Sequence, residues 1–142
     1  MITSNQCFKR FGDPRTEKYM TIHYFSDELR AYIPALPARI YCHQLLVEPL
    51  NKALKTVLFN RLEKEIKTWD GCFNIRSKKG AQSMSLHAWG LAIDINAAWN
   101  GFNKTPTMSH ELVQCFKDAG FDWGGDWTRP DGMHMQLAEL PK

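Results

Sequence analysis

One long amphipathic stretch near the middle of the chain restricts its fold more than any other sequence feature. Apolar residues recur there at helical spacing, while lysines and arginines fill the other faces of the same helix. The apolar set is Leu50, Ala53, Leu54, Val57, Leu58, Leu62 and Ile66. Pro49 suits a first helical turn, and Asp70 with Gly71 supplies a stop signal. The spacing therefore predicts one helix over about 48–68.

The elements after this helix are shorter. They are a predicted strand over 72–75, a strand over 91–96, a helix over 109–119 and a strand over 133–137. These elements do not alternate as repeated βαβ units, so the sequence favours the α+β class. The chain has no internal repeat and no low-complexity tract.

The first 42 residues lack such periodicity, because Gly12, Pro14, Pro34 and Pro37 interrupt any long element. We expect residues 1–42 to form an irregular arm of turns and short extended pieces, packed on a core of residues 43–142. A chain of 142 residues fits one domain, since two separate cores would each be undersized. The sequence therefore predicts a single domain over residues 1–142.

Composition excludes several classes of protein. An apolar fraction of 44% with 12% aromatic residues is enough for a packed core, which argues against a disordered chain. The net charge of +3 is mild, and no block of Lys and Arg is dense enough to indicate nucleic-acid binding. The sequence has no run of 18 apolar residues, so it does not predict a membrane span. The first six residues do not begin the apolar region of a signal peptide, so we expect none.

The four cysteines lie 30 or more residues apart, at Cys7, Cys42, Cys72 and Cys115. With no Cys-x-x-Cys pair, they do not predict a cysteine zinc knuckle or a thioredoxin-type redox site. We expect reduced, buried thiols, although the sequence leaves pairing open.

Two of the five histidines stand near carboxylates: His87 precedes Asp94 by seven residues, and His134 follows Asp131 by three. Asp94 lies inside an apolar strand, where an unpaired charge is expensive to bury, and a divalent metal would compensate it. Two imidazoles and one carboxylate with an open position form the ligand set of a catalytic zinc site, whereas calcium and magnesium prefer oxygen ligands. Spacing alone leaves an alternative open, in which Asp94 pairs with an arginine such as Arg76.

Two longer motifs carry a resemblance to a known family. Residues 85–96, SLHAWGLAIDIN, contain the pattern S-x-H-x-x-G-x-A-x-D. Residues 121–127 contain W-G-G-D-W, and residues 131–134 read D-G-M-H. In order and separation these motifs resemble the D-alanyl-D-alanine carboxypeptidase family, which includes the L-alanyl-D-glutamate endopeptidases that phages use as endolysins. The resemblance covers about residues 39–137.

The resemblance implies Zn²⁺ as cofactor, with His87, Asp94 and His134 as its ligands. It implies that Asp131 is the general base, and that Arg76 contacts the substrate and the developing oxyanion. Ser85 matches the motif serine, for which the resemblance implies a contact to the substrate or behind the ligands. The implied fold is a small antiparallel sheet flanked by helices, like that of the hedgehog and DD-peptidase proteins.

One departure from the family pattern stands in the last strand, where Gln136 replaces a glutamate that many relatives carry after the final histidine. Because Asp131 is retained, the change leaves the implied catalytic carboxylate in place. The substitution leaves open whether substrate contacts near this strand are the same as in those relatives.

The function implied is hydrolysis of a peptide bond in peptidoglycan stem peptides by a monomeric peptidase domain. Among peptidases of this kind, the preferred activity is that of an L-alanyl-D-glutamate endopeptidase acting as a phage endolysin. We expect such a protein to be made in the host cytoplasm and released to the cell wall by a holin. A D-alanyl-D-alanine carboxypeptidase is one alternative. A zinc-binding module of the same fold without catalysis is another, against which the retention of Asp131 and Arg76 argues.

Overall fold

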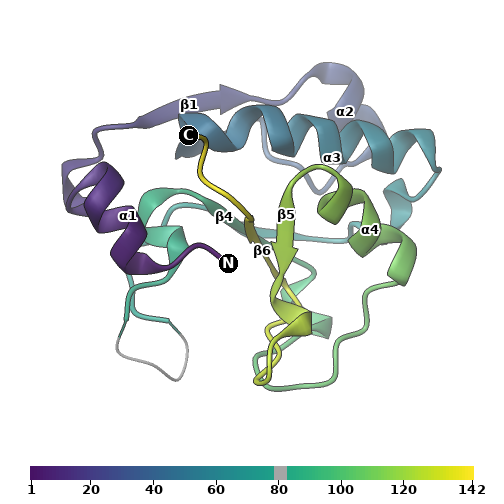
Figure 1. Ribbon diagram of the computed structural model, residues 1–142. Helices are drawn as coiled ribbons and strands as arrows, with labels where there is room; N and C mark the ends of the chain where they lie inside the picture. The colour runs from purple at the N-terminus through teal and green to yellow at the C-terminus, as the bar shows by residue number, and fades with distance from the viewer. Residues whose placement is uncertain (79–82) are drawn as a thin grey trace.

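Residues 1–78 and 83–142 are described by a computed structural model of the protein (Figure 1). Helices and two antiparallel sheets are mixed along the chain, which is the α+β class that the sequence predicted. The helices and strands are α1 (Ser4–Phe11), β1 (Met20–Tyr24), α2 (Asp27–Tyr32), β2 (Arg39–His43), α3 (Val47–Phe59), β3 (Trp69–Gly71), β4 (Ala92–Ile95), α4 (His110–Asp118), β5 (Phe121–Trp123) and β6 (His134–Leu137). No helix in this described part is long and apolar enough to cross a membrane.

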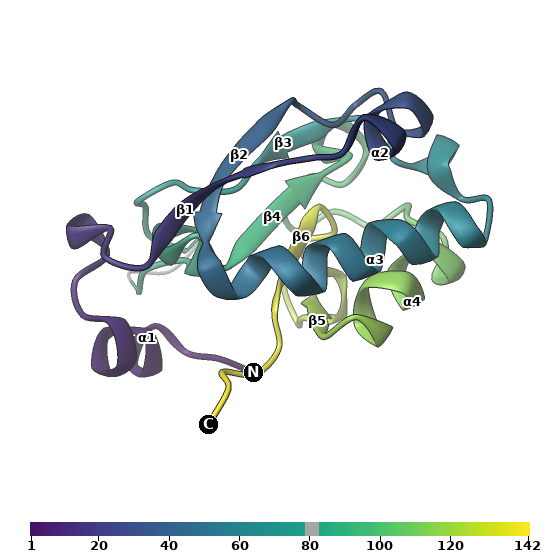
Figure 2. The same cartoon turned by 90° about the horizontal axis from the view of Figure 1, so that it is seen from above.

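The larger sheet has the strand order β3-β4-β6-β5, and every neighbouring pair in it is antiparallel. The smaller sheet pairs β1 with β2. Seen from above, α3 and α4 lie side by side against the larger sheet (Figure 2). Their apolar faces meet the sheet in the main core, where Leu54, Ile93 and Phe116 are buried together. This packing holds β4 and β6 as neighbours in the middle of the sheet.

The central helix begins where the sequence predicts but ends about nine residues early, at Phe59. Arg61 takes a left-handed backbone conformation with φ of 58°. The Arg61 amide donates to the Leu58 carbonyl, and the Leu62 amide donates to the Val57 carbonyl. These two bonds form a Schellman cap, which ends a helix and commonly has glycine at the left-handed position. The apolar periodicity continues past the cap because the returning segment also packs on the core.

The expectation of an irregular arm over residues 1–42 is wrong, because this region contains two helices and both strands of the smaller sheet. Thr3 and Gln6 form a capping box that starts α1. Phe11 from this helix is buried in a second apolar cluster with Leu86 and Trp89. Figure 1 shows α1 at the opposite end of the molecule from α4. The N-terminal segment therefore supports the turn that carries His87.

The strand predicted over 72–75 lies instead at Trp69–Gly71, where β3 pairs with β4 through an irregular register. Beyond Gly71 the backbone leaves the ladder, and the Cys72 carbonyl accepts a hydrogen bond from the His87 ring. β4, α4 and β6 match their predicted ranges to within one residue at each end. The three-residue β5 was not predicted, because it is too short to carry a pattern.

All four cysteines are free and buried, as the sequence predicted. Burial raises the pKa of Cys7 to about 12 and that of Cys42 to about 11. Because the thiolate is the reactive form, these thiols are inert at neutral pH.

His43 is a buried imidazole away from the motifs. Its ring lies 4.5 Å from that of Phe11 and is stacked at 5.7 Å on that of Tyr19, measured between centroids. Nδ1 accepts a hydrogen bond from the Leu45 amide, whereas the buried Nε2 has no hydrogen-bond partner among the described residues. Burial lowers the pKa of His43 to about 4. The folded protein therefore holds this ring in the neutral form.

We expect the free energy of unfolding to fall as the pH drops from about 6.5 to about 4, by at most roughly 3 kcal/mol from His43. In that window the unfolded chain binds a proton at this residue and the folded chain does not. Urea unfolding at pH 7 and pH 4.5 measures the difference. His43→Asn keeps an acceptor for the Leu45 amide but cannot titrate, so its stability should depend less on pH. Equal pH dependence in both proteins would contradict the assignment.

Candidate metal centre

Three sequence-predicted residues meet where the larger sheet borders a short 3-10 turn. Asp94 on β4 and His134 on β6 are directly opposite each other in the antiparallel register. His87 lies in the turn Leu86–Trp89, which begins with Ser85 accepting a hydrogen bond from the His87 amide at 3.3 Å. One potential ligand atom from each of His87, Asp94 and His134 lies within 4.8 Å of the others, and all three side chains are buried.

The nitrogens of the two imidazoles that face away from Asp94 are already committed. His87 Nδ1 lies 2.6 Å from the Cys72 carbonyl oxygen, and His134 Nε2 lies 2.9 Å from Gln136 Oε1. Oxygens of these kinds only accept hydrogen bonds, so each outward nitrogen carries the ring proton. His87 Nε2 and His134 Nδ1 therefore present lone pairs toward each other and toward the carboxylate.

The inward atoms form a closely spaced set of electron-pair donors. His87 Nε2 lies 3.1 Å from Asp94 Oδ1 and 3.1 Å from His134 Nδ1, and the third separation, from His134 Nδ1 to Asp94 Oδ1, is 3.5 Å. Asp94 Oδ1 is buried and has no hydrogen-bond partner among the described residues. Two imidazole nitrogens and a carboxylate oxygen at these separations form a donor set that fits a divalent metal ion.

The charge state of Asp94 suits the same use. Burial on its own raises the pKa of this carboxyl group, but hydrogen bonds and positive charge from His134 and His87, when an inward ring nitrogen carries a proton, lower the pKa well below its ordinary value. Asp94 is therefore ionised at neutral pH. Arg76 Nη2 lies 3.6 Å from Oδ2, so the arginine pairing that the sequence left open is also present. It engages the other carboxylate oxygen, and the two readings of Asp94 do not exclude each other.

Asp131 lies just before β6, buried and three residues from His134. Its amide donates to the Gly124 carbonyl at 2.9 Å, and its carbonyl accepts from the His134 amide at 3.0 Å. A Cβ atom on Gly124 would stand only 2.4 Å from the Asp131 carbonyl oxygen. The glycine of W-G-G-D-W is therefore needed for the close approach that holds the second motif together. Asp131 does not belong to the three-residue group found among the described residues.

A cavity of about 710 Å³ borders this group and brings together Arg76, Ser85, Asp131 and His134. The sequence did not single out Lys78, Phe102 and Arg129, which line the same cavity. The Arg129 guanidinium lies 5.6 Å from the centre of the Phe102 ring, which joins the loop before α4 to the loop before β6. Of these three residues, only Arg129 could have been predicted from the sequence to line the cavity, because it lies two residues before Asp131.

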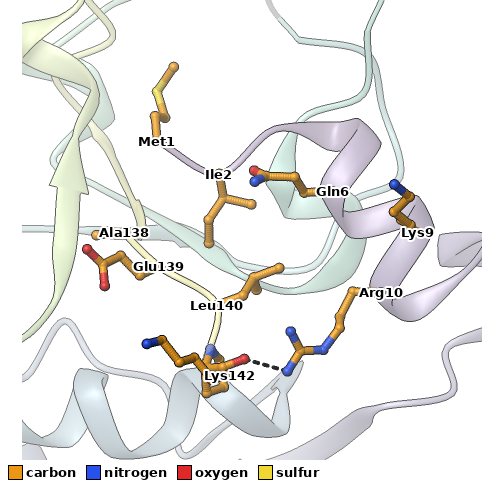
Figure 3. A pocket seen from close by; sticks show the side chains of 10 residues that line it. Met1, Ile2, Gln6, Lys9, Arg10, Ala138, Glu139, Leu140 and Lys142 are labelled. Carbon is orange, nitrogen blue, oxygen red and sulfur yellow. Dashed lines mark hydrogen bonds between the residues drawn. The ribbon is translucent and has the colours of Figure 1, made fainter.

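A second cavity, of about 590 Å³, lies between α1 and the C-terminal residues 138–142 (Figure 3). The Arg10 guanidinium donates a hydrogen bond to the Pro141 carbonyl across it. None of the sequence-predicted site residues lines this second cavity. The candidate catalytic and substrate-binding side chains line the cavity of about 710 Å³.

Residues 79–137 match the profile of a family described as D-alanyl-D-alanine carboxypeptidase. This span contains His87, Asp94, Asp131 and His134, whereas Arg76 precedes it. A comparison with curated proteins found no significant match. A crystal structure of the Serratia marcescens L-Ala D-Glu endopeptidase ChiX is similar, with 19% sequence identity and a TM-score of 0.48 over 81% of this chain and 90% of that chain. The two motifs that carry the resemblance, residues 85–96 and 121–134, both lie within the span that matches this family's profile.

Proposed function

We propose that this protein hydrolyses a peptide bond in peptidoglycan stem peptides with zinc held by His87, Asp94 and His134. The observation that carries the proposal is the convergence of two lone-pair nitrogens and an ionised carboxylate beside a cavity of about 710 Å³. This ligand set is that of catalytic zinc sites, which keep a position open. Zinc bound there would supply Lewis acidity, which acidifies water and polarises a carbonyl oxygen.

Asp131 is the proposed general base. It lines the cavity together with His134, and the backbone bonds to Gly124 and His134 fix its place. As the attacking water adds to the scissile carbonyl carbon, the Asp131 carboxylate takes one of its protons. The same carboxyl then gives that proton to the leaving amine as the C–N bond breaks. The products are an amine and a carboxylic acid, which ionises by releasing its remaining proton to solvent, and Asp131 returns to its ionised form.

Arg76 and Ser85 line the wall of the cavity beside this group. The Arg76 guanidinium, on a partly buried side chain and 3.6 Å from Asp94, supplies a cation where negative charge develops on the carbonyl oxygen. The Ser85 hydroxyl is engaged by the His87 amide, so this residue supports a ligand as well as the cavity wall. These roles agree with what the family resemblance implies for both residues.

The proposed specificity is that of an L-alanyl-D-glutamate endopeptidase, acting on the wall as a phage endolysin. A D-alanyl-D-alanine carboxypeptidase is the second candidate. Such an enzyme must bind the free terminal carboxylate of its substrate, which needs a cation or a backbone nest. Arg76, Lys78 and Arg129 all line the cavity, and such cations suit that task. We also propose that residues 1–142 act as one monomeric peptidase domain, since α1 packs on the turn that carries His87.

The products of digestion separate the two candidates. We expect intact sacculi to lose turbidity and to release stem peptides with a new D-glutamate amino terminus. Mass spectrometry of the soluble fragments identifies the bond, and His134→Ala protein is the inactive control. If free D-alanine is the only new product, the carboxypeptidase is the right assignment. Lysis of host cells that depends on a co-expressed holin would test the endolysin role.

A further inference from the structure

Gln136 lies on β6 two residues after His134, with only 2% of its surface exposed. Side chains two apart on a strand point to the same face, so the amide stands beside the imidazole. The distance between Gln136 Oε1 and His134 Nε2 is 2.9 Å. The sequence marked this residue only as a departure from the family pattern. In the structure it is the hydrogen-bond partner of a candidate metal ligand.

The two imidazoles of the site are oriented by different kinds of group. His87 Nδ1 donates to the Cys72 backbone carbonyl, which can only accept and cannot rotate away. His134 Nε2 depends on a side-chain amide, which can present either an oxygen or an NH₂ group. With the oxygen toward the ring, the proton stays on Nε2 and the lone pair on Nδ1 points at Asp94 and His87. With the NH₂ group toward the ring, the proton moves to Nδ1, and that nitrogen can no longer bind a metal.

We propose that Gln136 is a positioning residue that holds His134 in the tautomer able to bind metal, and that its neutral amide keeps metal affinity below what a carboxylate would give. The inference rests on the proposed function, because it takes His134 as a ligand. Partners that accept a proton from a ligating imidazole typically change metal affinity about 10- to 100-fold when removed. A carboxylate accepts more strongly than an amide and has no donor orientation.

Two substitutions at this position separate orientation from packing. Gln136→Met keeps a buried side chain of similar length but removes the acceptor, so we expect the zinc dissociation constant to rise about 10- to 100-fold. Gln136→Glu provides a stronger acceptor and should bind zinc more tightly than the original protein, so equal affinity would contradict the role of the neutral amide. Gln114→Met, on α4 and away from the site, is the matched control and should leave zinc affinity unchanged. Competition with a chromophoric chelator gives the dissociation constants.

The tautomer of His134 provides a readout that does not depend on zinc or activity. Long-range ¹H–¹⁵N spectra of the metal-free protein should show a protonated Nε2 in the original protein and in Gln136→Glu. Gln136→Met should show a mixture of tautomers. Unchanged zinc affinity together with an unchanged tautomer in Gln136→Met would overturn the inference, and so would Gln136→Glu binding more weakly than Gln136→Met. If the original protein binds no zinc, the proposed function fails, and the spectra still decide whether Gln136 sets the tautomer.

Discussion

Replacing His134 or His87 by alanine is expected to remove zinc from the protein and to reduce hydrolysis to background. The purified original protein should contain about one zinc per chain, since three ligand atoms converge at one point. Each substitution leaves only two protein ligands. Losing a direct ligand should cost more than the roughly 10- to 100-fold in affinity that loss of an outer hydrogen-bond partner costs. Metal analysis after gel filtration and a peptidoglycan digestion assay measure both effects.

The matched control is His110→Ala, because His110 is an exposed histidine at the start of α4, outside the three-residue group. This variant should keep its zinc and its activity. Full zinc occupancy in both His87→Ala and His134→Ala would show that the convergence of these side chains does not hold the metal. Circular dichroism of each variant checks that the sheet is retained.

Asp131→Asn is expected to keep zinc and to lose about 100- to 10,000-fold in turnover, the usual contribution of general-base catalysis. The asparagine side chain has the shape of aspartate, and the backbone bonds to Gly124 and His134 do not involve the carboxylate. The amide cannot accept a proton from the attacking water. The loss should therefore appear in kcat, with the metal content unchanged, and steady-state kinetics with parallel metal analysis distinguishes the two.

Asp126→Asn provides the comparison, because Asp126 lines the same cavity and lies 2.7 Å from Lys117 in an exposed ion pair. Such pairs contribute little to stability, so this variant should fold and turn over nearly normally. An Asp131→Asn protein without zinc would mean that Asp131 is a ligand. A comparable loss of turnover in Asp126→Asn would move the role of base to that residue.

The sequence predicted those elements whose apolar pattern is long or whose strand is buried on both faces. The start of α3 and the position of β4 are of this kind. The end of α3 was missed because Arg61 occupies a left-handed position that usually signals itself by glycine. In the N-terminal 42 residues, α1 was missed because the prolines were given more weight than two helix signals. These signals are the capping box of Thr3 and Gln6 and the apolar pair Cys7 and Phe11, one helical turn apart.

The candidate site also contains residues that the sequence predicted and residues that it could not predict. The motifs named His87, Asp94 and His134, and the fold brings them together because β4 and β6 are adjacent. The Cys72 carbonyl has no sequence signature, since any residue has a carbonyl and only the turn after β3 aims this one at His87. The contribution of Phe102 and Arg129 to the cavity depends on two loops meeting in space. Spacing along a single chain carries no information about such meetings.

The pairing of Asp94 with His134 across neighbouring strands also affects how the protein folds. These residues are 40 positions apart, 134 minus 94, so the metal group cannot exist until the chain closes a loop of that length. Closing it costs roughly 3 kcal/mol of chain entropy plus a constant. A metal that binds only the closed form adds RT ln(1 + [L]/Kd) to the free energy of unfolding. The melting temperature should therefore depend on free zinc concentration, and the metal would fasten the two central strands at the position where they are directly opposed.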